Sequence, residues 1–153
     1  MNLTSATRLR IASLAVVAAL IAGIGTFTSF NTYHNDISHI DSSITDVVSV
    51  IEANPNQAIG AALFQIENQS FDLVVMLHSY DGRATLVRDS SSQLSKAIRV
   101  SDIASGTSRS VLQRSHDGRT YRYETIEIIG GDALFIAGES TEAHSTFVNN
   151  LRI

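Results

Sequence analysis

The stretch from Ile11 to Phe30 holds twenty residues without a charged side chain, and it constrains the fold more than any other feature of the sequence. A helix of this length extends about 30 Å, which matches the hydrocarbon thickness of a bilayer. The run is too long for the apolar region of a cleaved signal peptide, which normally has about 7–15 residues. The sequence therefore predicts an uncleaved transmembrane helix at residues 11–30.

The charges on either side of this run predict its orientation. Arg8 and Arg10 precede it, and the first charged residue after it is Asp36. Basic residues are retained on the cytoplasmic side of a membrane, so we expect residues 1–10 in the cytoplasm and residues 31–153 outside it. The expected location is the cell membrane, with a single pass in this chain.

The composition excludes several classes of function. The chain has no cysteine, which excludes a disulfide scaffold, a thiol nucleophile and a cysteine-based zinc site. A net charge of −4 argues against nucleic acid as a partner. The sequence has neither an ordered nucleophile motif nor a glycine-rich phosphate loop. We therefore expect no catalysis and no cofactor in this chain.

An amphipathic pattern follows the apolar run without a break. Apolar residues spaced alternately by three and four continue the helix, at Tyr33, Ile37, Ile40, Ile44, Val47 and Ile51. This stripe predicts either a helix that packs on the sheet of its own domain or the seam of a parallel dimer, and the sequence leaves both open. Ala15, Ala19 and Gly23 in the apolar run form a ridge of small residues that suits helix pairing, which favours a homodimer.

The long helix is expected to end near Asn54-Pro55-Asn56, because proline disfavours helical geometry in the residue before it. A second, shorter helix is expected at about residues 57–68. The apolar period then changes from helical spacing to two, which predicts strands. The expected strands are at residues 71–78, 83–88, 110–114, 119–129 and 133–138.

Turn and cap signals separate these strands. Asp81-Gly82, Asp117-Gly118 and Gly130-Gly131 mark turns, because these pairs tolerate positive φ. The serine-rich residues 89–109 predict a loop with one or two helical turns, and Ser140 is expected to cap a final helix. The predicted fold class is α+β: a transmembrane helix that continues into a long helix, then a five-stranded antiparallel sheet with helices against one face.

Three segments resemble one known family. They are residues 71–83 (FDLVVMLHSYDGR), residues 117–122 (DGRTYR) and residues 133–142, which cover the last strand and the start of the last helix. They are similar to segments of the extracytoplasmic sensor domains of actinobacterial-type membrane histidine kinases, whose fold is PAS-like, of the PDC type. Two positions depart from the family: Thr141 stands where a leucine is usual, and Ile128 or one of its neighbours replaces a proline that is frequent late in the penultimate strand.

The resemblance implies a function. The chain would be the input region of a two-component sensor histidine kinase, which relays a stimulus through transmembrane helices to a cytoplasmic kinase and its response regulator. A second transmembrane helix and the kinase, with its ATP-dependent autophosphorylation, would then follow residue 153. The alternative is a complete single-span, membrane-anchored binding protein without kinase output. The sequence predicts neither the stimulus nor the cognate regulator.

Two groups of side chains are candidate sites. Arginine and tyrosine beside the predicted strands suit a small anion, and these ligand-binding candidates are Tyr80, Arg83, Arg114, Tyr121 and Arg122. The alternative is that the tyrosines cover the sheet and the arginines face water. His34, Asp36 and His39 are candidate metal ligands, because their spacing on a helix lets two of them converge. The alternative for these three is a solvated helix face.

Overall fold

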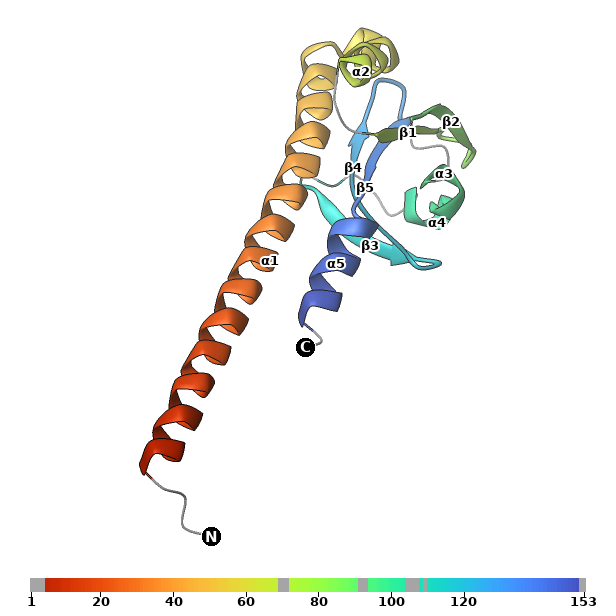
Figure 1. Cartoon of the computed structure of the whole chain (residues 1–153). Helices are drawn as coiled ribbons and strands as arrows, with labels where there is room; N and C mark the ends of the chain where they lie inside the picture. Colours follow the sequence, from red (N-terminus) through yellow and green to blue (C-terminus); the bar gives the residue numbers. More distant parts are fainter. Residues whose placement is uncertain (1–4, 69–71, 91–93, 104–107, 109, 152–153) are drawn as a thin grey trace.

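The computed structural model describes residues 5–68, 72–90, 94–103, 108 and 110–151, and it shows an α+β chain in which a long helix carries a sheet domain (Figure 1). Helix α1 (Ser5–Ala53) is uninterrupted over 49 residues. The predicted apolar run and the predicted amphipathic helix are therefore one continuous element. Residues 1–4 of the expected cytoplasmic segment lie outside the described residues.

The first half of α1 is separate from the sheet domain (Figure 1). All side chains from Leu9 to Thr28 are exposed, including every large apolar one. Within the described part of the chain, α1 is the one helix long and apolar enough to cross a membrane. A membrane would remove this apolar surface from water, which the sheet domain does not do.

The end of α1 lies where the proline predicts it. Asn54 leaves helical geometry, with φ −131° and ψ 58°, while its N–H still donates to the carbonyl of Val50. A short 3₁₀ helix, η1 (Pro55–Gln57), and helix α2 (Ala58–Glu67) follow. Because Pro55 forces the preceding residue out of the helical region, the chain reverses there and α2 packs against the end of α1.

The sheet has five antiparallel strands, as the sequence predicts. They are β1 (Leu73–His78), β2 (Ala84–Asp89), β3 (Leu112–His116), β4 (Arg119–Glu127) and β5 (Ala133–Glu139), in the order β2-β1-β5-β4-β3. Phe71, which opens the predicted first strand, lies outside the described residues. The expected helical turns between β2 and β3 are α3 (Leu94–Ala97) and α4 (Val100–Ile103).

The predicted turns between the strands are present. Gly82, Gly118 and Gly130 all have positive φ, as does Asp117 at 49°. The side chain of Asp132 joins two of the turns, because its Oδ1 accepts a hydrogen bond of 2.9 Å from the backbone N–H of Tyr80. The hairpin between β1 and β2 is therefore fixed to the hairpin between β4 and β5.

The expectation that helices cover one face of the sheet is wrong. Helices α1 and α2 pack on one face. On the other face lie Leu94 of α3, Ile103 of α4 and Ile98 from the link between these two helices. The cause lies in β1 and β5, two of the three inner strands, which carry consecutive buried apolar residues. Successive side chains of a strand point to opposite faces, so such a strand needs cover on both sides.

The apolar stripe of α1 packs on the chain's own sheet. Its buried members are Ile40, Ile44, Val47 and Ile51. They lie in one cluster with Leu73 and Val75 of β1 and with Leu134 and Ile136 of β5. Gly138 of β5 allows this close approach, since a Cβ there would lie 2.7 Å from Ile40 Cγ2 and 3.0 Å from Leu73 Cδ2. The sequence left open whether the stripe packs on the sheet of its own domain or forms the seam of a parallel dimer. In the structure it packs on the sheet of its own domain.

We expect Gly138→Val to destabilise the chain by about 1–3 kcal/mol, because the added side chain overpacks the contact between β5 and α1. Urea denaturation of the full chain in detergent micelles, followed by the near-ultraviolet circular dichroism of its tyrosines, measures the change. Gly60→Ala is the control, because nothing lies within 4 Å of a Cβ at this exposed position of α2. The control should stabilise the helix by about 0.5–1 kcal/mol. An unchanged midpoint for Gly138→Val would contradict the close approach.

Candidate functional site: the junction of the sheet with two helices

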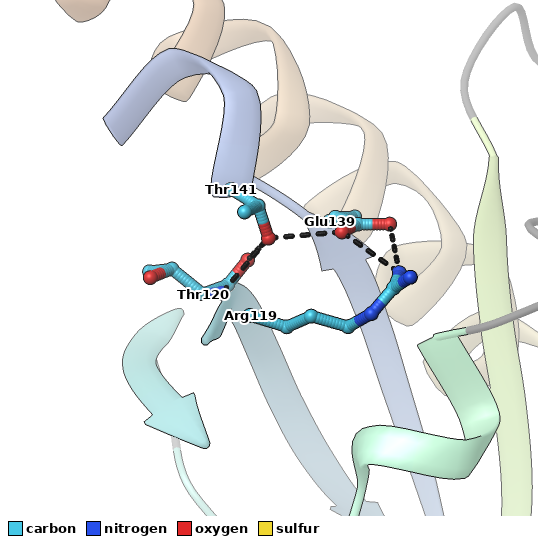
Figure 2. Close-up of polar contacts among 4 residues, drawn as sticks. All are labelled: Arg119, Thr120, Glu139 and Thr141. Carbon is cyan, nitrogen blue, oxygen red and sulfur yellow. Dashed lines mark hydrogen bonds and ion pairs between the residues drawn. The ribbon is translucent and has the colours of Figure 1, made fainter. Parts of the chain in front are cut away.

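The last helix, α5 (Thr141–Leu151), begins at a polar cluster on the end of β4 and β5 (Figure 2). Arg119 Nη1 donates to both carboxylate oxygens of Glu139, at 3.0 and 3.1 Å. Each side chain of the pair is 30% exposed. The pair therefore joins the first residue of β4 to the last residue of β5, immediately before α5 starts.

Thr141 fixes the first turn of α5 to β4 (Figure 2). Its Oγ1 accepts a hydrogen bond of 2.9 Å from the backbone N–H of Thr120. The same hydroxyl lies 2.9 Å from Glu139 Oε1 and 3.2 Å from the carbonyl oxygen of Thr120, either of which accepts its proton. The backbone N–H of Ser140 also donates to that carbonyl, at 2.8 Å. The start of α5 is thus held to the sheet by several directional bonds.

Ser140 occupies the position before the helix, as the sequence predicts, but its side chain does not cap it. Its carbonyl accepts the first helical hydrogen bond, from the N–H of His144 at 3.0 Å, whereas its Oγ is buried without a partner. The neighbouring hydroxyl of Thr141 makes the polar contacts instead. Thr141 is therefore the residue that joins α5 to the sheet.

A second ion pair joins α1 to the sheet. Arg122 of β4 donates through Nε to Asp41 Oδ1, at 2.6 Å, and through its second nitrogen, Nη2, to Asp41 Oδ2. The side chains are 17% and 30% exposed, so the pair lies at the rim of the apolar contact between α1 and the sheet. Bidentate arginine–carboxylate pairs fix orientation as well as distance. This pair therefore sets the rotation of α1 relative to β4.

Helices α1 and α5 are also in direct contact, and they run antiparallel (Figure 1). Phe147 stacks on Tyr33, with ring centroids 4.6 Å apart. One turn further along α5, Asn150 Nδ2 donates to Ser29 Oγ at 3.0 Å. As α5 proceeds toward its C-terminal end, it therefore lies beside earlier residues of α1, closer to the apolar half of that helix.

We call the contacts of Asp41–Arg122, Arg119–Glu139 and Thr141–Thr120 the helix–sheet junction.

Glu124 is a buried carboxylate on the face of β4 that α1 covers. Its side chain is only 7% exposed, and burial raises its pKa above the usual value of 4.5, with a further contribution from the negative charge of Glu52 on α1. Burial disfavours the charged form of an acid, and a like charge adds to this effect. The carboxylate thus opposes the packing of α1 when it is ionised.

The five ligand-binding candidates do not meet in one place. Tyr80 and Arg83 are exposed in the hairpin between β1 and β2, where Arg83 Nε lies 3.4 Å from Asp81. Tyr121 is fully buried under α3 and α4, on the same face as Arg114, whose guanidinium lies over the ring of Tyr123. Arg122 points to the opposite face, against α1. The sheet therefore separates the predicted anion site into three parts.

The metal candidates lie on the exposed part of α1. The ring of His34 stacks with that of Phe30, with the ring centroids 6.4 Å apart and an angle of 3° between the ring planes. Asp36 and His39 are exposed. Asp41, on the next turn, pairs with Arg122. Among the described residues, no three His, Cys, Asp or Glu side chains converge as metal ligands would.

The residues of the helix–sheet junction were not identifiable from local patterns. Asp41 and Arg122 are separated by 81 residues, and nothing near either one indicates its partner. One signal was available: Arg119 and Thr120 lie in one segment of the family resemblance, and Glu139 and Thr141 lie in another. The structure brings these two segments together (Figure 2).

The fold and this junction define an α+β domain carried on a long apolar helix. The scan of protein-family models finds no match to the chain, and searches of the curated proteins and of the solved structures find none either.

We expect the Asp41–Arg122 pair to have a coupling energy of about 1–3 kcal/mol in a double-mutant cycle of Asp41→Asn and Arg122→Gln. The reason is its low exposure and bidentate geometry. Urea denaturation of the four proteins measures the coupling. The exposed pair Asp81–Arg83 is the matched control, with an expected coupling of at most about 0.5 kcal/mol. Equal coupling in the two cycles would contradict the assignment of Asp41–Arg122 as an anchor of α1.

We expect Glu124→Gln to gain stability relative to the native chain as the pH rises above about 4.5. The folded chain holds the proton of Glu124 to a higher pH than the unfolded chain, so native stability decreases as the pH rises through the raised pKa. Glutamine does not ionise, so the stability of the variant does not decrease in this way. Urea midpoints between pH 4 and 8 measure the difference, with Glu127→Gln as an exposed control on the same strand. Parallel pH profiles for Glu124→Gln and the native chain would contradict the raised pKa.

Proposed function

We propose that the chain is the extracytoplasmic input region of a two-component sensor histidine kinase. In this proposal residues 11–30 span the cell membrane, residues 31–153 lie outside, and the domain is PAS-like, of the PDC type. The chain itself catalyses nothing. Its partners are the membrane, a second copy of the chain in a homodimer, and a cytoplasmic response regulator that is reached through the kinase.

The observation that carries this proposal is that one sheet is attached to two helices, α1 and α5, and that both extend from the sheet toward the apolar half of α1. Helix α1 is continuous from its apolar half to the buried contact with β1 and β5. Helix α5 is fixed to β4 and β5 and runs back along α1 toward that apolar half. An input domain needs this connection, because a change at the sheet must move one helix relative to the other.

The way the two helices are held supports a role in transmission. Apolar packing is not directional, so α1 can shift on the sheet by a small step once the Asp41–Arg122 pair opens. The bonds of Thr141 are directional, so α5 moves together with β4 and β5. A stimulus that favours one arrangement over the other changes the position of α5 along α1. The free energy available for this change is the difference between the binding free energies of the stimulus for the two arrangements.

The test is autophosphorylation in membranes that contain the complete protein encoded by the gene. We expect the reading frame to continue beyond the codon for Ile153 into a second apolar span and a kinase that incorporates the γ-phosphate of ATP on histidine. A stop codon directly after Ile153 would overturn the proposal and leave the single-span binding protein as the function.

We expect Ile44→Asp and Ile40→Asp, each measured in the same membranes, to lock the kinase in one state or abolish its response. The reason is that either charge breaks the packing of α1 on the sheet. Thr45→Asp is the control, because it places the same charge on an exposed position of α1. Phosphorylation that responds normally in both isoleucine variants would contradict the role of this packing in transmission.

A further inference from the structure

Glu124 is a buried acid that its surroundings do not neutralise. Its side chain is 7% exposed and lies on the face of β4 that α1 covers, beside Ile136 of β5 in the strand register. No hydrogen bond or ion pair connects its carboxylate to another residue that the structure describes. A buried carboxylate without a partner is far less favourable than the neutral acid, so the protonated form of Glu124 fits this position.

The arginine on the same face of β4 is bound to other acceptors. Arg122, two residues before Glu124, donates through Nε and Nη2 to Asp41. Its remaining terminal nitrogen, Nη1, donates to Gln113 Oε1 at 3.4 Å. The guanidinium is therefore used by α1 and β3, and it does not hold Glu124 in the ionised form.

The charged group of α1 that acts on Glu124 is a second acid. Burial raises the pKa of Glu124 above 4.5, and the negative charge of Glu52 raises it further. The described residues that face the same side from the neighbouring strands carry no titratable group, and they are Gln113 and Ser115 of β3 and Leu134, Ile136 and Gly138 of β5. The electrostatic surroundings of Glu124 thus favour its neutral form.

The two remaining helices near this face do not change that balance. Helix α2 contributes only apolar side chains to the shared core, namely Ala58, Ala62 and Ile66. Helix α5 meets β4 at Thr120, four residues from Glu124. Of its titratable residues, Glu142 is exposed and His144 contacts the ring of Tyr33.

Asp41 and Glu52 mark two ends of one side of α1. At about 100° per residue they lie within about 20° of each other round the helix and about three turns apart along it. The Asp41–Arg122 pair attaches one end to β4. At the other end an ionised Glu124 repels Glu52. Ionisation of Glu124 therefore acts on one end of the contact while the other end stays attached.

We propose that Glu124 is a proton-binding site through which the chain responds to acidity outside the membrane. The inference rests on the proposed function, and it names the proton as the stimulus. When Glu124 is protonated, α1 packs on the sheet as in the structure. When Glu124 is ionised, the end of α1 near Glu52 moves away from β4, because water then reaches the carboxylate and the two negative charges separate.

The direction of the response follows from proton linkage. The arrangement with α1 packed binds the proton of Glu124 more tightly than the displaced arrangement, in which the carboxylate is hydrated. Acid therefore favours the packed arrangement. A rise in pH through the raised pKa favours the displaced one.

The test is the distance between α1 and the sheet as a function of pH. The chain has no cysteine, so two introduced cysteines are unique sites for spin labels. Ser49→Cys on α1 and Leu112→Cys on β3 place the labels at exposed positions. Double electron–electron resonance of the full chain in lipid nanodiscs, between pH 4 and 8, should show two distances whose proportions follow one proton titration with a midpoint above 4.5. Glu124→Gln should lose this change and keep the low-pH distance throughout.

Two further variants make the result specific. Glu52→Gln should lower the midpoint, because it removes the like charge, and its exposed position keeps the test valid even where Glu124→Gln does not fold. Glu127→Gln, exposed on the same strand, should leave the midpoint unchanged. A distance that is the same at every pH would overturn the inference. A transition that persists in Glu124→Gln would also overturn it, because another group such as His144 would then be the one that titrates.

Autophosphorylation of the complete protein encoded by the gene separates this inference from the proposed function. In right-side-out vesicles loaded with ATP at a fixed inner pH, phosphorylation of the native protein should depend on the outer pH, and that of Glu124→Gln should not. A kinase whose labels do not move with pH overturns the proton site alone, and one whose phosphorylation ignores the outer pH overturns the proton as the stimulus. A protein that moves with pH but has no kinase overturns the proposed function and leaves the proton site.

Discussion

The packing of α1 on one face of the sheet is the contact on which the other features of the structure depend. Five apolar side chains of α1 lie in one cluster with residues of β1 and β5, and Gly138 lets the helix come close enough for them to be buried. Because α1 has no break between this contact and its apolar half, the sheet domain has a defined position relative to that apolar half. Without this burial, the Asp41–Arg122 pair would join two elements, α1 and β4, that are free to separate.

The polar contacts add orientation to this apolar contact. Asp41–Arg122 and Arg119–Glu139 are partly exposed, so each contributes less to stability than the buried stripe does. Their effect is geometric, since a bidentate or shared carboxylate accepts a bond from a limited range of directions. Glu124 acts in the opposite sense, because its ionised form is desolvated beneath α1. The position of α1 thus reflects a balance between groups that hold it and one that opposes it.

Local features of the fold were predictable from the sequence. The end of α1 at Pro55 and the Asp-Gly turns depend on backbone preferences of one or two residues, and the structure confirms them. The partner of the apolar stripe depends on pairing between distant strands, which periodicity does not encode. The cover on both sheet faces was predictable from the consecutive apolar residues of β1 and β5. The separation of Tyr121 from Arg122 was also predictable, because adjacent residues of a strand point to opposite faces.

The difference between the two helix attachments has a mechanical consequence. Helix α5 continues directly from β5 and is bonded to β4 through Thr141, so it follows any movement of these strands. Helix α1 touches the same strands mainly through apolar side chains, whose contacts are not directional. The contact between the helices runs from Tyr33–Phe147 to Ser29–Asn150 and lies beside the apolar half of α1. Under the proposed function, this contact is where a change in the sheet would displace one helix relative to the other.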